Sequence, residues 1–226
     1  MKSSYNYFIF DLETTGLKPG VEKWSDKEVS ESELKVLKSK TAAVIEIAII
    51  ILNENLNKIA EYSSGVMRMY DDRGIEQAAL DHNGITRQQI EQGRDSKEVY
   101  KELMKFIKDT KITKSKLILC GQNIIKFDNP HFEDFFRVHG GDLWKHVDNG
   151  FFLDTLLLGR CKHIESENYQ LGTLCKNVGI SLTDAHRAMR DTRANADLII
   201  NYIRALRGEG TGATKKEERL RIKFQF

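Results

Sequence analysis

Apolar residues along the chain first follow the pattern of β-strands. Tyr5 to Leu12 is aromatic and β-branched and predicts a strand. Ala42 to Leu52 is almost continuously apolar, as in a buried strand, and Lys58 to Met69 predicts a third strand. The Asn-rich stretch from Asn53 to Asn57 predicts a turn between these two segments, so we expect a hairpin.

Beyond residue 90 the apolar residues recur at helical spacing instead. Asp95 and Glu98 form a capping pair ahead of an apolar stripe. Further helical patterns cover residues 129–138, 156–161, 170–178 and 187–206, and short strands are expected at 116–120 and 151–153. Strands that come first and then alternate with helices predict an α/β fold, with helices packed on a mixed sheet.

Two polar stretches stand outside this pattern. Residues 18–41 are expected to form a solvated insertion, with a short helix at Ser30 to Lys38. A glycine-rich linker begins at residue 208 and leads into a basic tail whose alternating apolar residues predict a strand. We therefore expect one domain over residues 1–207, followed by a linker and tail over 208–226.

Composition narrows the class of protein. The chain has 226 residues, is 40% hydrophobic and 30% charged, and so is not disordered throughout. Thirty-five Lys and Arg against 33 Asp and Glu leave a net charge of +2, without the basic excess of many nucleic-acid-binding proteins. The sequence has no apolar run of about 18 residues to span a membrane and no secretory signal. Its 3 cysteines lack CxxC spacing and are typical of reduced thiols, so we expect a cytoplasmic protein.

Two carboxylates close the first strand. Asp11 and Glu13 are two residues apart, and residues i and i+2 of a strand share one face. Both side chains therefore point the same way at the rim of the core. Taken on their own, the two are interpreted by default as ordinary surface acids ahead of a turn.

Two further acids and a histidine follow other elements. Asp128 lies just past the 116–120 strand, where a helix N-cap explains it as well as a functional role does. Asp191 falls on the apolar stripe of the last helix, where a carboxylate is costly unless it is paired or binds a metal. His186 stands five residues before Asp191, and beside converging acids it is a candidate base.

Convergence of the four acids would require cations, because like charges raise each other's pKa. Hard oxygen ligands without cysteine favour Mg²⁺ or Mn²⁺. Two such ions, about 3.5–4 Å apart, can stabilise both oxygens of an in-line phosphoryl displacement. His186 can then deprotonate the attacking water. Spacing along the sequence does not by itself establish that the groups meet.

The acids lie in motifs that resemble those of the DEDDh 3'-5' exonucleases, the DnaQ-like family. The motifs occur in family order: FDLETTGL at 10–17, VIEIA at 44–48, HNGIT at 82–86, NIIKFD at 123–128, DT at 154–155 and HRAMRD at 186–191. The form of the first motif favours proofreading-type members, such as the DNA polymerase III epsilon-type domain. The resemblance implies an RNase H-like fold, in which a mixed five-stranded sheet is flanked by helices.

The resemblance also implies a role for each acid and for the histidine. Asp11 would bridge two Mg²⁺ or Mn²⁺ ions. Glu13 and Asp191 would complete one metal site, and Asp128 would hold the other ion, partly through water. His186 would act as the general base.

A site for the 3'-terminal nucleotide is implied as well. The backbone around Thr14, Thr15 and Gly16 would hold that nucleotide, and Leu17 would pack against its base or wedge beside it. Phe127 offers a second surface for base stacking, although it is also explained as a core residue.

Two segments depart from the family pattern. The insertion over residues 18–41 is longer than the usual loop, and it either reshapes the substrate groove or decorates its rim. The tail after residue 206 suits three partners: a DNA polymerase subunit, a second copy of the chain, or the chain's own sheet.

The function expected from these features is 3'-5' exonuclease activity on single-stranded DNA. An exoribonuclease of the ribonuclease T or oligoribonuclease type is the alternative, because no residue identifies a reader of the 2'-OH. An inactive nucleic-acid-binding module is disfavoured, since all four acids and His186 are intact. Two divalent cations would add +4 to the net charge of +2 and bring the loaded protein to +6. That balance suits an enzyme that binds a few terminal nucleotides.

Overall fold

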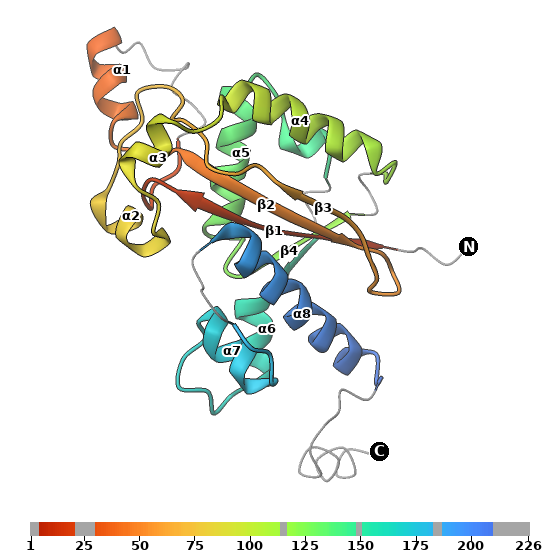
Figure 1. Cartoon of the computed structure of the whole chain (residues 1–226). Coiled ribbons are helices and arrows are strands. Elements are labelled where there is room, and N and C mark those ends of the chain that lie inside the picture. Colours follow the sequence, from red (N-terminus) through yellow and green to blue (C-terminus); the bar gives the residue numbers. More distant parts are fainter. Residues whose placement is uncertain (1–4, 21–29, 114–116, 148–150, 183–186, 210–226) are drawn as a thin grey trace.

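The sheet is the centre of the fold. A computed structural model describes residues 5–20, 30–113, 117–147, 151–182 and 187–209 (Figure 1). Within these residues five strands form one sheet in the order β3-β2-β1-β4-β5. Their bounds are β1 Asn6–Thr14, β2 Val44–Leu52, β3 Lys58–Ser63, β4 Leu117–Gly121 and β5 Phe152–Asp154. β1, β2 and β3 are antiparallel, while β4 and β5 continue parallel to β1, which confirms the expected mixed α/β sheet.

The helices expected from apolar periodicity are all present, and their ends agree with the expected ranges to within a residue or two. The described helices are α1 Glu31–Lys38, α2 Gln77–Asn83, α3 Arg87–Glu91, α4 Ser96–Asp109, α5 Asp128–Val138, α6 Thr155–Lys162, α7 Leu171–Asn177 and α8 Ala188–Leu206, with a short 3-10 helix η2 at Leu143–Lys145. The periodicity of apolar residues did not predict α2 or α3. Gly84 ends α2 in the left-handed conformation, and Thr86 begins α3 with a capping box to Gln89.

The two faces of β1 pack against different helices. The even-numbered residues of β1, which are Phe8, Phe10 and Leu12, belong to a core cluster that also contains residues of α4 and α5. Tyr7 and Ile9, at odd positions, pack instead with α8, which crosses one side of the sheet in Figure 1. Asp11 and Glu13 continue the odd series. Because side chains alternate along a strand, both acids face the α8 side of the sheet.

The third strand ends earlier than the sequence predicted. β3 stops at Ser63 rather than at Met69, because Gly65 adopts a left-handed conformation with φ of 63°. At Ser64 the backbone N–H still donates to the carbonyl of Ile47, but the N–H of Ile47 donates to the Ser64 hydroxyl instead of to a backbone carbonyl. Beyond the turn Met67 donates its N–H to the carbonyl of Ile45 on β2 at 2.8 Å and forms an isolated bridge with Arg94.

The insertion contains the short helix that its sequence predicted. α1 begins at Ser30, which forms a capping box with Glu33, and none of its residues is buried. Residues 21–29 of the insertion lie outside the described part of the chain. So do residues 210–226, which hold nearly all of the expected linker and the strand of the tail. Among the described residues no helix has the length and apolar character needed to cross a bilayer.

Candidate active site

Three of the expected acids converge. Asp11 and Glu13 end β1 on the face toward α8, and Asp191 lies in the first turn of that helix. One carboxylate oxygen from each lies within 4.8 Å of the other two. Glu13 is only 8% exposed, so the interpretation of the pair as ordinary surface acids is wrong. Oxygen donors this close together suit a divalent cation.

Asp128 approaches β1 from the side of α5. Its side chain is buried, and its Oδ1 accepts the backbone N–H of Leu12, between the two acids of β1, at 3.0 Å. The alternative of a helix N-cap is wrong, because Phe127 occupies that position and Asp128 is the first helical residue. Asp128 does not belong to the three-oxygen cluster, although its charge raises the pKa of Asp11.

The crowding of acids shifts their pKa values upward. Burial, followed by the charges of Asp128, Glu13, Asp191 and Glu46, raises the pKa of Asp11 well above its usual range. Burial and then the charge of Glu46 raise the pKa of Glu13 to about 8. Burial raises the pKa of Asp128 to about 7, although the Leu12 N–H opposes the shift. Such a cluster is costly to ionise without a cation.

We therefore predict that the metal-free protein loses stability as the pH rises. Above about pH 4.5 the unfolded chain releases the protons of Glu13 and Asp128, whereas the folded chain holds them until about pH 8 and about pH 7. The folded state thus binds more protons across this window, and its stability falls with pH. The melting temperature in EDTA should decrease from pH 5 to pH 8.5, and Mn²⁺ should restore more of it at pH 8.5.

Thermal unfolding at both pH values, with and without Mn²⁺, measures this effect. Surface acids with lowered pKa values, such as Glu61 and Glu102, titrate below the window and do not contribute. Asp109→Asn, at the exposed end of α4, is the matched control and should leave the profile unchanged. A metal-free melting temperature that is flat from pH 5 to pH 8.5 would contradict the prediction.

Glu46 is a fifth acid of the site that the sequence analysis treated only as part of a strand motif. It stands opposite Glu13 in the β1–β2 ladder and is buried. Its carboxylate accepts two hydrogen bonds from Arg187, at 2.9 and 3.1 Å, and the N–H of Ala188 at 3.4 Å. Glu46 therefore holds the start of α8, the helix that carries Asp191, against β2.

Asp154 organises the loop that leads to Asp128. Its Oδ1 accepts the N–H groups of Asn123 and Leu156, each at 2.9 Å. Asn123 has a φ of 56°, so the loop turns through a left-handed residue that Asp154 holds in place. From the sequence, Asp154 and Thr155 were recognised only as a motif, and no role was predicted for either residue.

The expected nucleotide-binding loop is rigidly held. The hydroxyl of Thr14 donates to the carbonyl of Gly16, and the hydroxyl of Thr15 donates to the carbonyl of Gly74, both at 2.7 Å. Both threonine side chains are buried, which leaves the backbone and Leu17 to meet a ligand. The side chain of Leu17 is 72% exposed and is therefore free to contact a ligand.

Of two other expected site residues, Phe127 is described by the structure and His186 is not. Phe127 is partly buried, and its ring centroid lies 4.8 Å from that of His131, so much of the ring packs inside the protein. His186 lies outside the described residues. Its neighbour Arg187 is described, and it is the N-cap residue of α8.

Comparison with known proteins identifies the family. The family model described as exonuclease matches residues 8–199. The chain belongs to this exonuclease family, which confirms the enzyme class and the DnaQ-like relationship expected from its motifs.

The similar curated proteins are DNA polymerases. The PolC-type DNA polymerase III of Bacillus subtilis is 26% identical over 200 residues, which cover 88% of this chain and 11% of that protein. The PolC-type enzyme of Thermotoga maritima is 23% identical over 220 residues, which cover 97% of this chain and 13% of that protein. The chain thus spans about a tenth of the length of these relatives.

Solved structures of E. coli exonuclease I share the fold. A zinc-bound complex of that enzyme with single-stranded DNA gives a TM-score of 0.66 at 18% identity and covers 90% of this chain and 41% of that chain. The complex with a dA16 oligonucleotide gives 0.65, also at 18% identity, and covers 90% of this chain and 41% of that chain. The likeness confirms the RNase H-like fold.

Proposed function

We propose that this chain is a 3'-5' exonuclease that releases nucleoside monophosphates from single-stranded DNA by two-metal-ion hydrolysis. The convergence of Asp11, Glu13 and Asp191 at the junction of β1 and α8 carries the proposal. Asp128 stands beside them on α5, so all four acids expected of the family gather at one end of the sheet. An inactive binding module has no use for this costly cluster.

The donor set fits the ions that we propose. Asp11, Glu13 and Asp191 would hold one Mg²⁺ or Mn²⁺, and Asp128 would hold a second together with Asp11. All four offer hard carboxylate oxygens, and the raised pKa values of Asp11, Glu13 and Asp128 support a site that cations would stabilise. Bound divalent ions would supply stabilisation of the charge that develops on the phosphate oxygens.

The chain's own residues would supply the remaining functions. His186 is proposed as the base that takes a proton from the attacking water, on the strength of its motif. The backbone from Thr14 to Gly16 and the exposed side chain of Leu17 would receive the terminal nucleotide, with Phe127 at its edge. The solved exonuclease I complexes with single-stranded DNA support single strands as the substrate.

A 5'-labelled single strand tests the proposal. In Mg²⁺ or Mn²⁺ the label should move through a ladder of successively shorter DNA products, and EDTA should stop the reaction. Shortening that persists in EDTA would contradict the metal mechanism. A matched RNA strand decides between the two substrates: faster shortening of RNA than of DNA would favour the exoribonuclease alternative.

A polymerase is the partner that the PolC relationship favours. In those relatives the matched region is about a tenth of a polymerase chain. We propose that this chain acts with a polymerase. The basic tail from residue 215 is the segment that we propose for the contact, and a second copy of the chain is the alternative partner. Co-purification of the full chain with and without residues 208–226 tests the assignment.

A further inference from the structure

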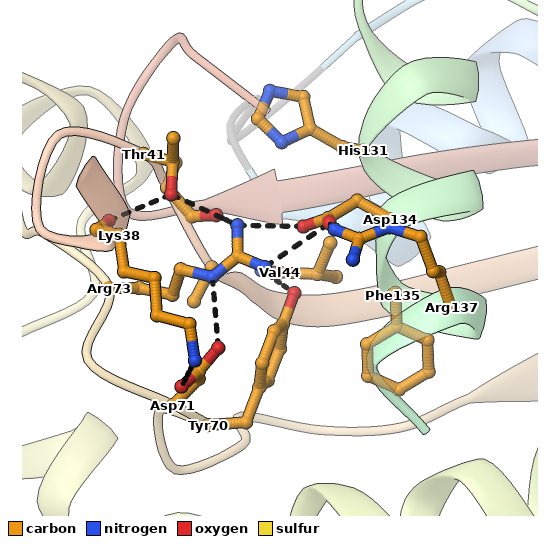
Figure 2. Close-up of polar contacts among 12 residues, drawn as sticks. Lys38, Thr41, Val44, Tyr70, Asp71, Arg73, His131, Asp134, Phe135 and Arg137 are labelled. Atoms are coloured by element: carbon orange, nitrogen blue, oxygen red, sulfur yellow. Dashed lines mark hydrogen bonds and ion pairs between the residues drawn. The ribbon is translucent and has the colours of Figure 1, made fainter. Parts of the chain in front are cut away.

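Arg73 and Asp134 form a buried ion pair next to the nucleotide-binding loop (Figure 2). Arg73 lies between β3 and α2, and Asp134 lies on α5, six residues after Asp128. Their side chains are 1% and 2% exposed. The guanidinium makes a two-point contact: Nη1 lies 2.8 Å from Oδ2, and Nη2 donates to Oδ1 at 3.1 Å. This paired geometry fixes the angle between the two segments as well as their distance.

Arg73 also ties the end of the insertion to this pair. Its Nη1 donates to the hydroxyl of Thr41 at 3.0 Å, and its guanidinium lies 5.7 Å from the centroid of the Tyr70 ring. Figure 2 shows these groups converging on the guanidinium from separate segments. Asp71 lies beside Nε and also pairs with Lys38 of α1. Three stretches of chain therefore meet at one buried cation.

The segment that follows Arg73 holds one side of the nucleotide-binding loop. The carbonyl of Gly74 accepts the hydroxyl of Thr15, and the N–H of Glu76 donates to the carbonyl of Thr15, both at 2.7 Å. Gly74 also donates its N–H to the carbonyl of Thr41 at 2.8 Å. A shift of Arg73 would therefore move the backbone that fixes Thr15.

The helix that carries Asp134 holds the other side of the loop. His131, one turn earlier on α5, donates through Nε2 to the carbonyl of Leu17 at 3.3 Å. Burial lowers the pKa of His131 to about 4, so the ring is a neutral donor. The backbone of Gly20 packs directly on the pair, because a Cβ there would collide with the side chains of both Asp134 and Arg73.

A gain in folding stability does not explain why this ion pair is buried. Removal of two charges from water costs about as much as their attraction returns, so an apolar replacement of both partners is often neutral or stabilising. A buried pair that joins two sides of one loop instead restricts geometry. We propose that Arg73 and Asp134 are a positioning pair, which sets the Thr14–Leu17 loop to receive the 3'-terminal nucleotide. This inference rests on the proposed function.

The pair also bears on the insertion. At the start of the insertion, Gly20 packs against Asp134, and at its end Thr41 accepts a hydrogen bond from Arg73. The two ends are also joined directly, because the carbonyl of Lys18 accepts the N–H of Ala42 at 2.7 Å. The base of the insertion is thus built into the wall of the nucleotide site. Of the two alternatives for residues 18–41, the role in shaping the groove follows from the proposal.

Replacement of both charges together tests the proposal. Arg73→Met combined with Asp134→Val removes both buried charges, and Arg137, which also pairs with Asp134, keeps a side chain that is 36% exposed to water. We expect KM for a single-stranded oligonucleotide to rise about tenfold or more, with kcat within about threefold of wild type. Hydrolysis of bis(4-nitrophenyl) phosphate, which has no nucleotide to position, should keep its wild-type rate. Arg73→Lys, which keeps the charge but loses the two-point contact, should give an intermediate KM.

The control is an exposed pair of the same chemistry. Arg94 and Glu102 lie 2.5 Å apart with side chains 41% and 50% exposed, and Arg94→Met with Glu102→Gln should leave KM unchanged. An unchanged KM in both the double variant and Arg73→Lys would overturn the proposal, as would a parallel fall in the rate on the small ester. A wild-type enzyme that does not shorten oligonucleotides would overturn the proposed function itself, and the positioning role with it.

Discussion

Asp11→Asn is expected to lower the rate of Mg²⁺-dependent exonucleolysis by about 10³-fold, because it removes the central ligand of the proposed metal site. The structure supports this central position. Asp128, Glu13, Asp191 and Glu46 all raise the pKa of Asp11, so its carboxylate lies among all the other acids. Asparagine has nearly the same shape but no charge, and the loss should appear in kcat on saturating single-stranded DNA.

The same substitution should have the opposite effect on stability. Without metal at pH 8, removal of one of several crowded like charges should raise the melting temperature. Mn²⁺ should then raise it less than in the wild type, because the remaining acids attract the cation less strongly. Asp109→Asn, an exposed acid outside the site, should change neither quantity. Wild-type activity in Asp11→Asn would overturn the assignment of the metal site.

The alternation of side chains between the two faces of β1 predicts that Asp11 and Glu13 share one face of the sheet. Tyr7 and Ile9 belong to the apolar layer under α8, so the acids at the next two odd positions face the same helix. Asp191 was recognisable as a candidate metal ligand because a carboxylate on the apolar stripe of a helix is costly unless it is paired or binds a metal. The two patterns meet in space because α8 packs on that face of the sheet.

Other parts of the site depend on contacts that local patterns do not encode. Glu46 faces Glu13 only because of the β1–β2 register, and its partner Arg187 is 141 residues away. The Arg73–Asp134 pair joins residues 61 apart that lie in a loop and a helix. No periodicity relates such positions, since tertiary packing alone brings them together. The helix α3 was not predicted, although Thr86 followed three residues later by Gln89 is a capping-box signal that lies in the sequence.

A comparison of two substitutions at Asp128 separates its structural role from its chemical one. Its Oδ1 accepts the N–H of Leu12, which attaches the start of α5 to β1, and its charge contributes to the acid cluster. Asparagine keeps an oxygen for that N–H but removes the charge. Alanine removes both and leaves a buried N–H unpaired, at a cost of about 1–3 kcal/mol.

Asp128→Asn should therefore retain the wild-type melting temperature, or exceed it in EDTA above pH 7, because burial raises the pKa of the native carboxyl to about 7. Its exonuclease rate should still fall by about 10²-fold or more, since an amide oxygen is a weaker ligand for a hard cation. Asp128→Ala should lose both activity and several degrees of melting temperature. Thermal unfolding and oligonucleotide kinetics on the two variants separate the effects. Full activity in Asp128→Asn would show that Asp128 serves only to accept the Leu12 N–H.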